Sequence, residues 1–370
     1  MALSEKANED PVQTHCKREI LGAFWPQNTS SALAVRESRE HCPWNAYFQH
    51  YTAECRKTIE PDGGKHATVR QHQDIIPIIR QLEEGRTKET IKLSLAALVT
   101  QKRSETDKQH MAEGSIRLAV RLFLMVDVGA PSKYRTWGPS FLPWSDEQTV
   151  KAVLTNHFVI SSTESQDTVF KEEFTAFNLQ RFTGLEIQWT NNLADHLRLI
   201  DNDRRLYIFH HATFLQHQTR HVSKYHPTYV TNCSSDLFPD NFINETLRTL
   251  DLLFPRQDAE SQRWLRSQQS HGEDAVHPDL ALLDRNTMFS TDRRAANFVY
   301  WRDELVSLKE RFDLPKPTSI SQFWYDRRNR TQWYTFWIAV TVLCLTVFFG
   351  LVQSIEGALQ VYKAYHPVPN

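Results

Sequence analysis

The sequence predicts a mainly α-helical protein: a helical cytosolic domain with a small two-strand β element, followed by one C-terminal transmembrane helix. Three observations support this fold class. Only 11 of the 370 residues are glycine, well below the usual share of about 7%, and this disfavours β-rich folds and glycine-loop phosphate sites. Apolar residues recur at helical spacing through much of the chain. Residues 333–352 form an apolar run without a charged side chain.

Composition excludes several classes of function. The net charge of −1 provides no overall field that would recruit nucleic acid, so we expect no nucleic-acid partner. The five cysteines form no CxxC pair and their number is odd, which argues against a disulfide framework or a structural zinc site. The first 20 residues contain no apolar segment, so no cleavable signal peptide is expected. We expect no cofactor.

The first part of the chain is expected to be a poorly ordered extension over residues 1–65, because it is polar and of mixed charge, although the apolar piece Ile20–Trp25 can still dock. The helical domain then covers residues 66–290. Its first helices are predicted at residues 69–85, where Pro77 weakens the pattern, and at residues 88–101. Residues 115–129 are apolar on nearly all sides and predict a central buried helix.

A capping box of Ser145 and Gln148 predicts the start of a helix that runs to Phe158. Further along, Asp240 is the predicted N-cap of a helix. Its inward stripe is Ile243, Leu247, Leu250 and Phe254.

The β element is expected where two short β-prone runs, Leu185–Trp189 and Arg205–Phe209, flank a helical piece at residues 193–199. A long amphipathic helix is expected over residues 291–313. Its apolar side chains follow a 3-4 spacing, which we interpret as packing on the protein's own body, with a coiled coil as the alternative. That stripe consists of Phe298, Trp301, Leu305, Leu308 and Phe312.

The apolar run at residues 333–352 is long enough to cross the hydrocarbon core of a bilayer, about 30 Å at 1.5 Å per residue. Trp333 and Trp337 at one end and Val352 at the other bound this membrane anchor, with the tryptophans at the interface. A basic and aromatic linker at residues 314–332 precedes it, and a short tail at residues 353–370 follows. We therefore expect a tail-anchored, single-pass protein.

Orientation follows from basic side chains beside the span. Arg327, Arg328 and Arg330 precede it, whereas only Lys363 follows, so the positive-inside rule predicts that the N-terminal body is cytosolic. The short span and weakly basic tail favour the endoplasmic reticulum or the plasma membrane. Within the span, small residues on one face suggest self-association through close helix packing. They are Thr335, Ala339, Thr346 and Gly350.

A histidine-rich stretch, residues 210–227, raises the question of a metal site. His217 and His221 stand four apart and would share one helix face, but no HExxH glutamate accompanies them. His210 and His211 are adjacent in a predicted strand and are expected to point to opposite faces. We keep these four histidines as weak candidates only and predict no metal site.

An Asp195–His196 pair is the other catalytic candidate. A hydrolase would need a nucleophile beside this pair, and the sequence has no G-x-S-x-G elbow. It also has no P-loop, dinucleotide-binding fingerprint or kinase signature. An enzyme is therefore the less favoured class.

Two blocks, "LEIQWTNNLADHLRLIDNDRRLYIFHHATFL" and "ISQFWYDRRNRTQWYTFWIAVTVLCLTVFFGLVQSIEGALQVYKAYHP", resemble the signature regions of an uncharacterised family of fungal single-span membrane proteins. The resemblance extends from about Val69 to the C-terminus. It implies a cytosolic helical body with a C-terminal anchor and a fungal source, and it carries over no activity and no catalytic residue. His217, His221 and His226 lie in a local expansion outside the shared pattern.

We therefore predict a tail-anchored membrane protein whose helical domain is an interaction or scaffold module for an unidentified protein partner. The first alternative is a transport-related oligomer with a layout like that of CorA-type magnesium channels, although the Gly-Met-Asn motif and second span of those channels are missing. The second alternative is a membrane-tethered enzyme with a histidine-based site.

Overall fold

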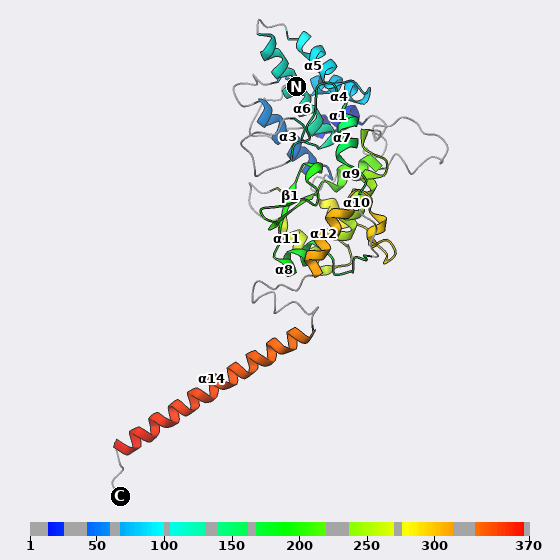
Figure 1. The fold of residues 1–370 in the computed structure, drawn as a ribbon. Coiled ribbons are helices and arrows are strands. Elements are labelled where there is room, and N and C mark those ends of the chain that lie inside the picture. The colour runs from blue at the N-terminus through cyan, green and yellow to red at the C-terminus, as the bar shows by residue number, and fades with distance from the viewer. Residues whose placement is uncertain are drawn as a thin grey trace.

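The computed structural model describes residues 14–25, 43–59, 67–99, 104–129, 140–161, 168–219, 237–269, 276–313 and 330–365. They form a helical body with a small three-stranded sheet, and a long apolar helix, α14 (Arg330–Tyr365) (Figure 1). The predicted mainly helical class is confirmed.

The N-terminal half of the body is built around one long helix, α6 (Glu105–Leu124), which packs against α3, α4 and α5. Ten of its residues are buried, as the all-round apolar pattern predicted. The packed helices of this half are α1 (Thr14–Phe24), α3 (Asn45–Ile59), η3 (His72–Asp74), α4 (Ile75–Glu83) and α5 (Lys88–Ala97).

The expectation of poor order over residues 1–65 is wrong for the part described, because α1 and α3 both lie within it. Most of their charged residues face outward, while Phe24 and Trp25 enter the core beside Tyr47 and Tyr51. The Tyr47 hydroxyl donates a hydrogen bond to the carbonyl of Leu122 at 2.7 Å, which joins α3 to α6. The charged residues on one face of these helices gave the segment a polar composition, although the other face is aromatic.

Pro77 does not disrupt α4, because it is the third residue of the helix. The backbone N–H groups of the first turn have no acceptor within a helix, so a residue without that N–H loses nothing there. The helix ends before Gly85, which adopts a positive φ of 72°.

The middle of the chain contributes α7 (Val150–His157) and α8 (Ala176–Thr183). The predicted capping box at Ser145 is wrong as the start of α7. Thr149 is the N-cap, with its hydroxyl accepting a hydrogen bond from the backbone N–H of Ala152 at 3.2 Å. The Gln148 N–H instead donates to the Ser145 carbonyl in a preceding turn.

The sheet has the order β1-β3-β2, with β1 (Glu186–Thr190) parallel to β3 (Arg205–Phe209) and β2 (Leu199–Ile200) antiparallel to it. The two β-prone runs predicted from the sequence are thus β1 and β3. The helical piece expected between them is a single 3-10 turn, η4 (Leu193–Asp195), followed by the unforeseen strand β2.

The C-terminal half covers the sheet with helices and turns. Its helix α10 (Phe242–Leu253) buries the predicted stripe, but its N-cap is Asn241 rather than Asp240. The expected helix over 291–313 divides into η7 and α12, and its five apolar side chains are all buried in the body, which confirms the first interpretation of that stripe. The remaining elements are α9 (Ala212–Thr219), α11 (Ala259–Gln268), η6 (Leu280–Asp284), η7 (Ala295–Asn297) and α12 (Arg302–Asp313).

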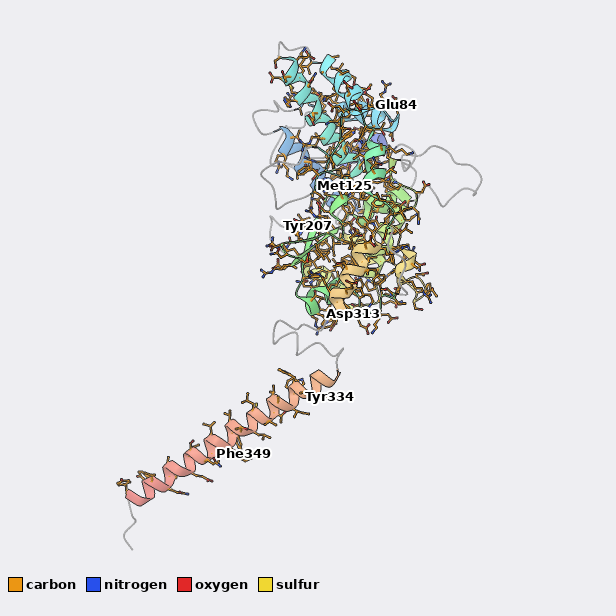
Figure 2. All side chains as sticks on the ribbon, viewed as in Figure 1. Glu84, Met125, Tyr207, Asp313, Tyr334 and Phe349 are labelled. Atoms are coloured by element: carbon orange, nitrogen blue, oxygen red, sulfur yellow. The ribbon has the colours of Figure 1, made fainter. Side chains whose placement is uncertain are left out.

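Side chains fill the interior of the body, whereas those of α14 project outward from the helix (Figure 2). A single apolar cluster extends from α1 to α12. The two halves of the body therefore share one core.

Candidate functional site

Three features of the described residues are candidates for a functional site: a buried histidine cluster, a cavity beside the sheet, and the exposed apolar helix α14. The first two lie in the body, where the end of β3 and the start of α12 position the polar side chains. We describe each from its contacts.

The histidine cluster forms where the chain leaves β3. His210 and His211 both place Nε2 against the side-chain oxygen of Asn191, at 3.0 and 2.7 Å, and their ring centroids are 4.0 Å apart. The strand ends at Phe209, so strict alternation no longer applies. The expectation that these histidines point to opposite faces is therefore wrong. Shared contact with Asn191 fixes each as an Nε2–H donor.

His50 of α3 joins this cluster, with its ring centroid 5.9 Å from that of His211. Both ring nitrogens of His50, and Nδ1 of His211, are buried without a hydrogen-bond partner among the described residues. Burial is the main cause that lowers the pKa of His50 to about 4 and that of His210 to about 3, and it also lowers the pKa of His211. The cluster is therefore neutral at pH 7, and sequence reasoning missed His50 because it lies 160 residues away from its neighbours.

His217 is separate from this cluster. It is buried on α9 between two tryptophans, with ring centroids 5.4 Å from Trp25 and 5.1 Å from Trp44. His221 lies outside the described residues, so the pairing of His217 with His221 stays untested. In the described ranges no group of three or more His, Cys, Asp or Glu side chains is arranged to hold a metal ion.

Asp195 and His196 follow one another in sequence but serve different bonds. The Asp195 carboxylate accepts from the Ser140 N–H at 3.0 Å, from the Ser140 hydroxyl and from Arg198 Nη1 at 2.7 Å. His196 accepts at Nδ1 from the Phe209 N–H at 3.2 Å and places Nε2 2.7 Å from the Thr249 hydroxyl. The pair does not form a catalytic dyad.

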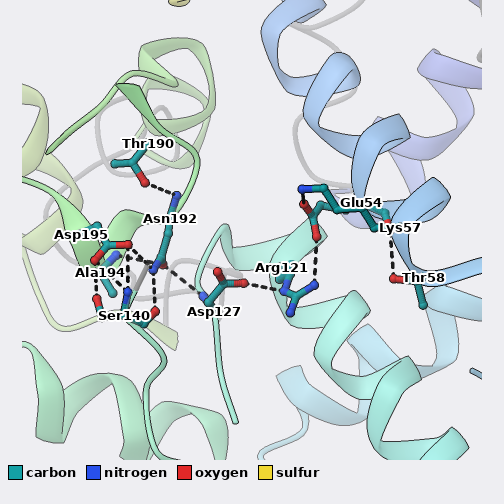
Figure 3. Close-up of polar contacts among 10 residues, drawn as sticks. All are labelled: Glu54, Lys57, Thr58, Arg121, Asp127, Ser140, Thr190, Asn192, Ala194 and Asp195. Carbon is teal, nitrogen blue, oxygen red and sulfur yellow. Dashed lines mark hydrogen bonds and ion pairs between the residues drawn. The ribbon is translucent and has the colours of Figure 1, made fainter. Parts of the chain in front are cut away.

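A chain of polar contacts links this region to the N-terminal helices (Figure 3). Arg121 of α6 forms ion pairs with Glu54, at 2.9 Å, and with Asp127. The Asp127 N–H donates to the Asn192 side-chain oxygen at 3.1 Å, and Asn192 Nδ2 donates to the Ser140 carbonyl at 2.8 Å and to Asp195 at 2.9 Å. These bonds fix the positions of α3, α6 and the 3-10 turn η4 relative to one another.

A cavity of about 730 Å³ lies beside this network, between the end of α7, strand β2 and the start of α12. Its volume falls within the range of about 300–1,000 Å³ found for small-molecule sites. Apolar and aromatic side chains form part of the wall, and Ser140, Arg198 and two carboxylates form part of the rest. The apolar and aromatic lining includes Phe158, Val159, Leu197, Leu199, Tyr300 and Trp301.

The start of α12 is fixed by a buried carboxylate from another helix. Glu245 of α10 accepts hydrogen bonds from the backbone N–H groups of Val299, Tyr300 and Trp301 at 2.8, 2.7 and 2.8 Å. These donors lie where a helix N-terminus favours negative charge. Glu245 therefore locks α12 to α10, and it sets the position of the acidic cavity wall that follows.

Helix α14 is the third feature. Its segment Tyr334–Tyr362 has a mean hydropathy of 2.3 over its most apolar 18 residues, and none of that window is buried. A span of 29 residues measures about 43 Å, longer than the hydrocarbon core of about 30 Å. The helix thus contains the predicted anchor 333–352 and continues beyond Val352.

The residues predicted to orient and pair this helix are placed only in part. Thr335, Ala339, Thr346 and Gly350 are exposed along it. A Cβ built on Gly350 would meet no described residue within 4 Å beyond its chain neighbours and the backbone of its own helix. Trp337 is partly buried. Trp333 and Arg330 lie in the helix, without described side chains, and Arg327 and Arg328 lie outside the described residues. Orientation and self-association therefore stay predictions.

Comparison with known proteins gives no match: no family model, curated protein or solved structure aligns with this chain at a significant level. The resemblance to fungal single-span membrane proteins accordingly stays a prediction from the quoted sequence blocks.

Proposed function

We propose that this chain is a single-pass membrane protein whose helical body lies in the cytosol and serves as an interaction or scaffold module for a protein partner. One observation carries the membrane part of the proposal. Helix α14 carries an 18-residue apolar window, none of which is buried against the described body. Apolar area on this scale is costly in water, at about 25 cal/mol per Å², and a bilayer removes that cost.

The helical geometry of α14 also suits a bilayer. Its threonine and serine hydroxyls bond back along the helix, with Thr341, Thr346 and Ser354 each donating at 2.8 Å to the carbonyl four residues earlier. Hydroxyl groups satisfied in this way are tolerated in hydrocarbon, because these donors already have an acceptor within the helix.

The proposed cytosolic orientation rests on the basic side chains before the span, Arg327, Arg328 and Arg330. The interaction role is supported by the use of polar groups inside the body. The side chains of Asp195, His196 and Glu245 all form hydrogen bonds to other elements of the body. Because each of these groups is already bonded within the body, a rigid docking unit is the better match to this arrangement.

Membrane insertion and orientation can be tested in one experiment. The full chain, with a glycosylation acceptor tag fused after Asn370, would be translated with microsomes and extracted with alkaline carbonate. We expect the protein in the pellet with one glycan on the tag, because the tag lies across the membrane from the body. The native sequons at Asn28, Asn232, Asn244 and Asn329 should remain unmodified.

Two controls separate the possible failures. A chain ending at Asp313 should be released by carbonate, since it lacks α14; release of the full chain as well would refute the anchor. A full chain whose tag is bare while native sequons carry glycans would keep the anchor and refute the cytosolic orientation.

A further inference from the structure

We propose that the cavity between α7, β2 and α12 is a binding site for a small organic cation, a primary ammonium carried on an apolar or aromatic body. The cation would be held by Glu304 and Asp303 on the first turn of α12, and its body by the apolar wall. This site is separate from the membrane anchor and from the histidine cluster.

The charge in the cavity wall points to a cation. Asp303 and Glu304 both line the cavity. Asp303 accepts a hydrogen bond from the Ser161 hydroxyl at 2.7 Å, and neither carboxylate forms an ion pair with a cation among the described residues. The one guanidinium in the wall, Arg198, is bound to the buried Asp195 at 2.7 Å, so its charge already has a partner. The wall therefore carries an excess of negative charge.

The two histidines in the wall do not offset this excess. Burial lowers the pKa of His196 to about 3, and burial also lowers that of His157, so both favour the neutral form at pH 7. Each lies in the wall beside apolar side chains. The negative groups thus face a cavity with little positive charge to balance them.

Glu304 gives the strongest single indication. Its Oε2 atom is shielded from solvent and accepts no hydrogen bond from the described residues. A buried carboxylate oxygen without a donor costs free energy. Burial is the main cause that raises the pKa of Glu304, with Asp303 and Glu245 adding to it, while a hydrogen bond to its own backbone opposes them. An ammonium group against this side chain, after rotation of its carboxylate, would supply the missing donor and the missing charge.

The remaining wall selects an organic cation over a metal ion. A hard metal ion needs several oxygen or nitrogen ligands converging on one point, and the described residues contain no such group of three acidic, histidine or cysteine side chains. Val159, Leu197 and Leu199 instead offer an apolar surface, and Trp301 adds an aromatic ring. The indole ring of Trp301 is held in place by its Nε1–H bond to the Thr246 hydroxyl at 2.9 Å.

The test uses three amines of different body size (phenethylamine, tryptamine and octylamine) with purified full-length protein in detergent. Binding would be measured by calorimetry at pH 7.5 up to 10 mM ligand. The uncharged analogue 2-phenylethanol and the anion 3-phenylpropionate match phenethylamine in shape. We expect at least one amine to bind with a Kd below about 1 mM, and phenethylamine to bind at least tenfold more tightly than either analogue.

The variant Glu304→Gln keeps the shape of the side chain and should weaken binding of the best amine at least tenfold. Glu310→Gln, on the exposed side of the same helix, is the matched control and should leave the Kd unchanged. If Glu304→Gln fails to fold, as judged by circular dichroism, Asp303→Asn takes its place with an expected weakening of at least threefold. No binding by any amine, equal binding of the alcohol, or equal weakening by the control variant would overturn the proposal.

Discussion

Replacing His50 with leucine should make the body less sensitive to acid without weakening it at neutral pH. His50 is buried, and both of its ring nitrogens lack a partner among the described residues. The substitution His50→Leu therefore removes no hydrogen bond of good geometry, only a weak contact with the backbone of Arg121. It also removes two buried polar atoms without good hydrogen-bond partners, and burying such a group costs about 1–3 kcal/mol of stability. At pH 8 we expect equal or slightly higher stability.

The acid effect follows from linkage between protonation and folding. Burial lowers the pKa of His50 from its ordinary 6.5 to about 4 in the folded chain, an effect that the nearby Glu54 only partly opposes. A group with a lowered folded pKa binds protons better when unfolded, so for a histidine the stability is full above pH 6.5 and falls as the pH drops toward 4. At pH 5 the unfolded histidine is protonated and the folded one is not, which costs about 2 kcal/mol.

The assay is urea unfolding of the full chain in detergent, followed by tryptophan fluorescence at pH 8 and pH 5. Between these two values the wild type should lose about 2 kcal/mol more than His50→Leu. Other titrating groups, including His210 and His211, are present in both proteins and largely cancel in the difference. His110→Leu, at an exposed position on α6, is the control and should lose as much as wild type. An equal loss in wild type and His50→Leu would refute the buried, neutral state of His50.

Two further predictions test how the body is held together. The variant Glu245→Ala removes the acceptor of three backbone N–H groups at the start of α12. It should lower the free energy of unfolding by about 3–5 kcal/mol, because the three donors lose their acceptor at a buried or partly buried position. Glu310→Ala should change it by no more than about 0.5 kcal/mol. Both are measured by urea unfolding at pH 7.5, and equal effects would contradict the role of Glu245. The variant Thr149→Ala removes the side-chain cap of α7 and should cost about 1 kcal/mol. Ser145→Ala should cost less than half of that in the same thermal or urea melt, and the reverse order would restore the capping box predicted from the sequence.

Local sequence patterns are sufficient to predict several elements of the structure. The stripe from Phe298 to Phe312 was identified as packing on the body because two heptads are too short for a coiled coil, and all five side chains are buried. The strands β1 and β3 were found by their β-branched and aromatic content. Each of these signals depends on neighbours within a few residues.

The predictions that were wrong concern features that no local sequence pattern determines. Helices α1 and α3 were missed as ordered elements because their polar residues dominate the composition. Their aromatic side chains are stabilised by contacts with distant elements, including Phe123 of α6 and Phe214 of α9. The two cap predictions failed by a few residues at most, because several adjacent polar residues can cap and the packing of the helix decides among them. Strand β2 has only two residues, too few for any periodic signal.

The candidate sites also include features that the local sequence determines and features that depend on tertiary packing. By itself the sequence determined the helical class and the apolar helix α14, because uninterrupted hydropathy and a 3.6-residue period are properties of a local stretch of chain. Only the tertiary structure decided that His50 meets His211, that His210 and His211 share Asn191, and that Glu304 lines a cavity with Arg198. These residues are separated by up to about 160 positions, and the physical reason is that their proximity depends on how the shared core packs distant elements together.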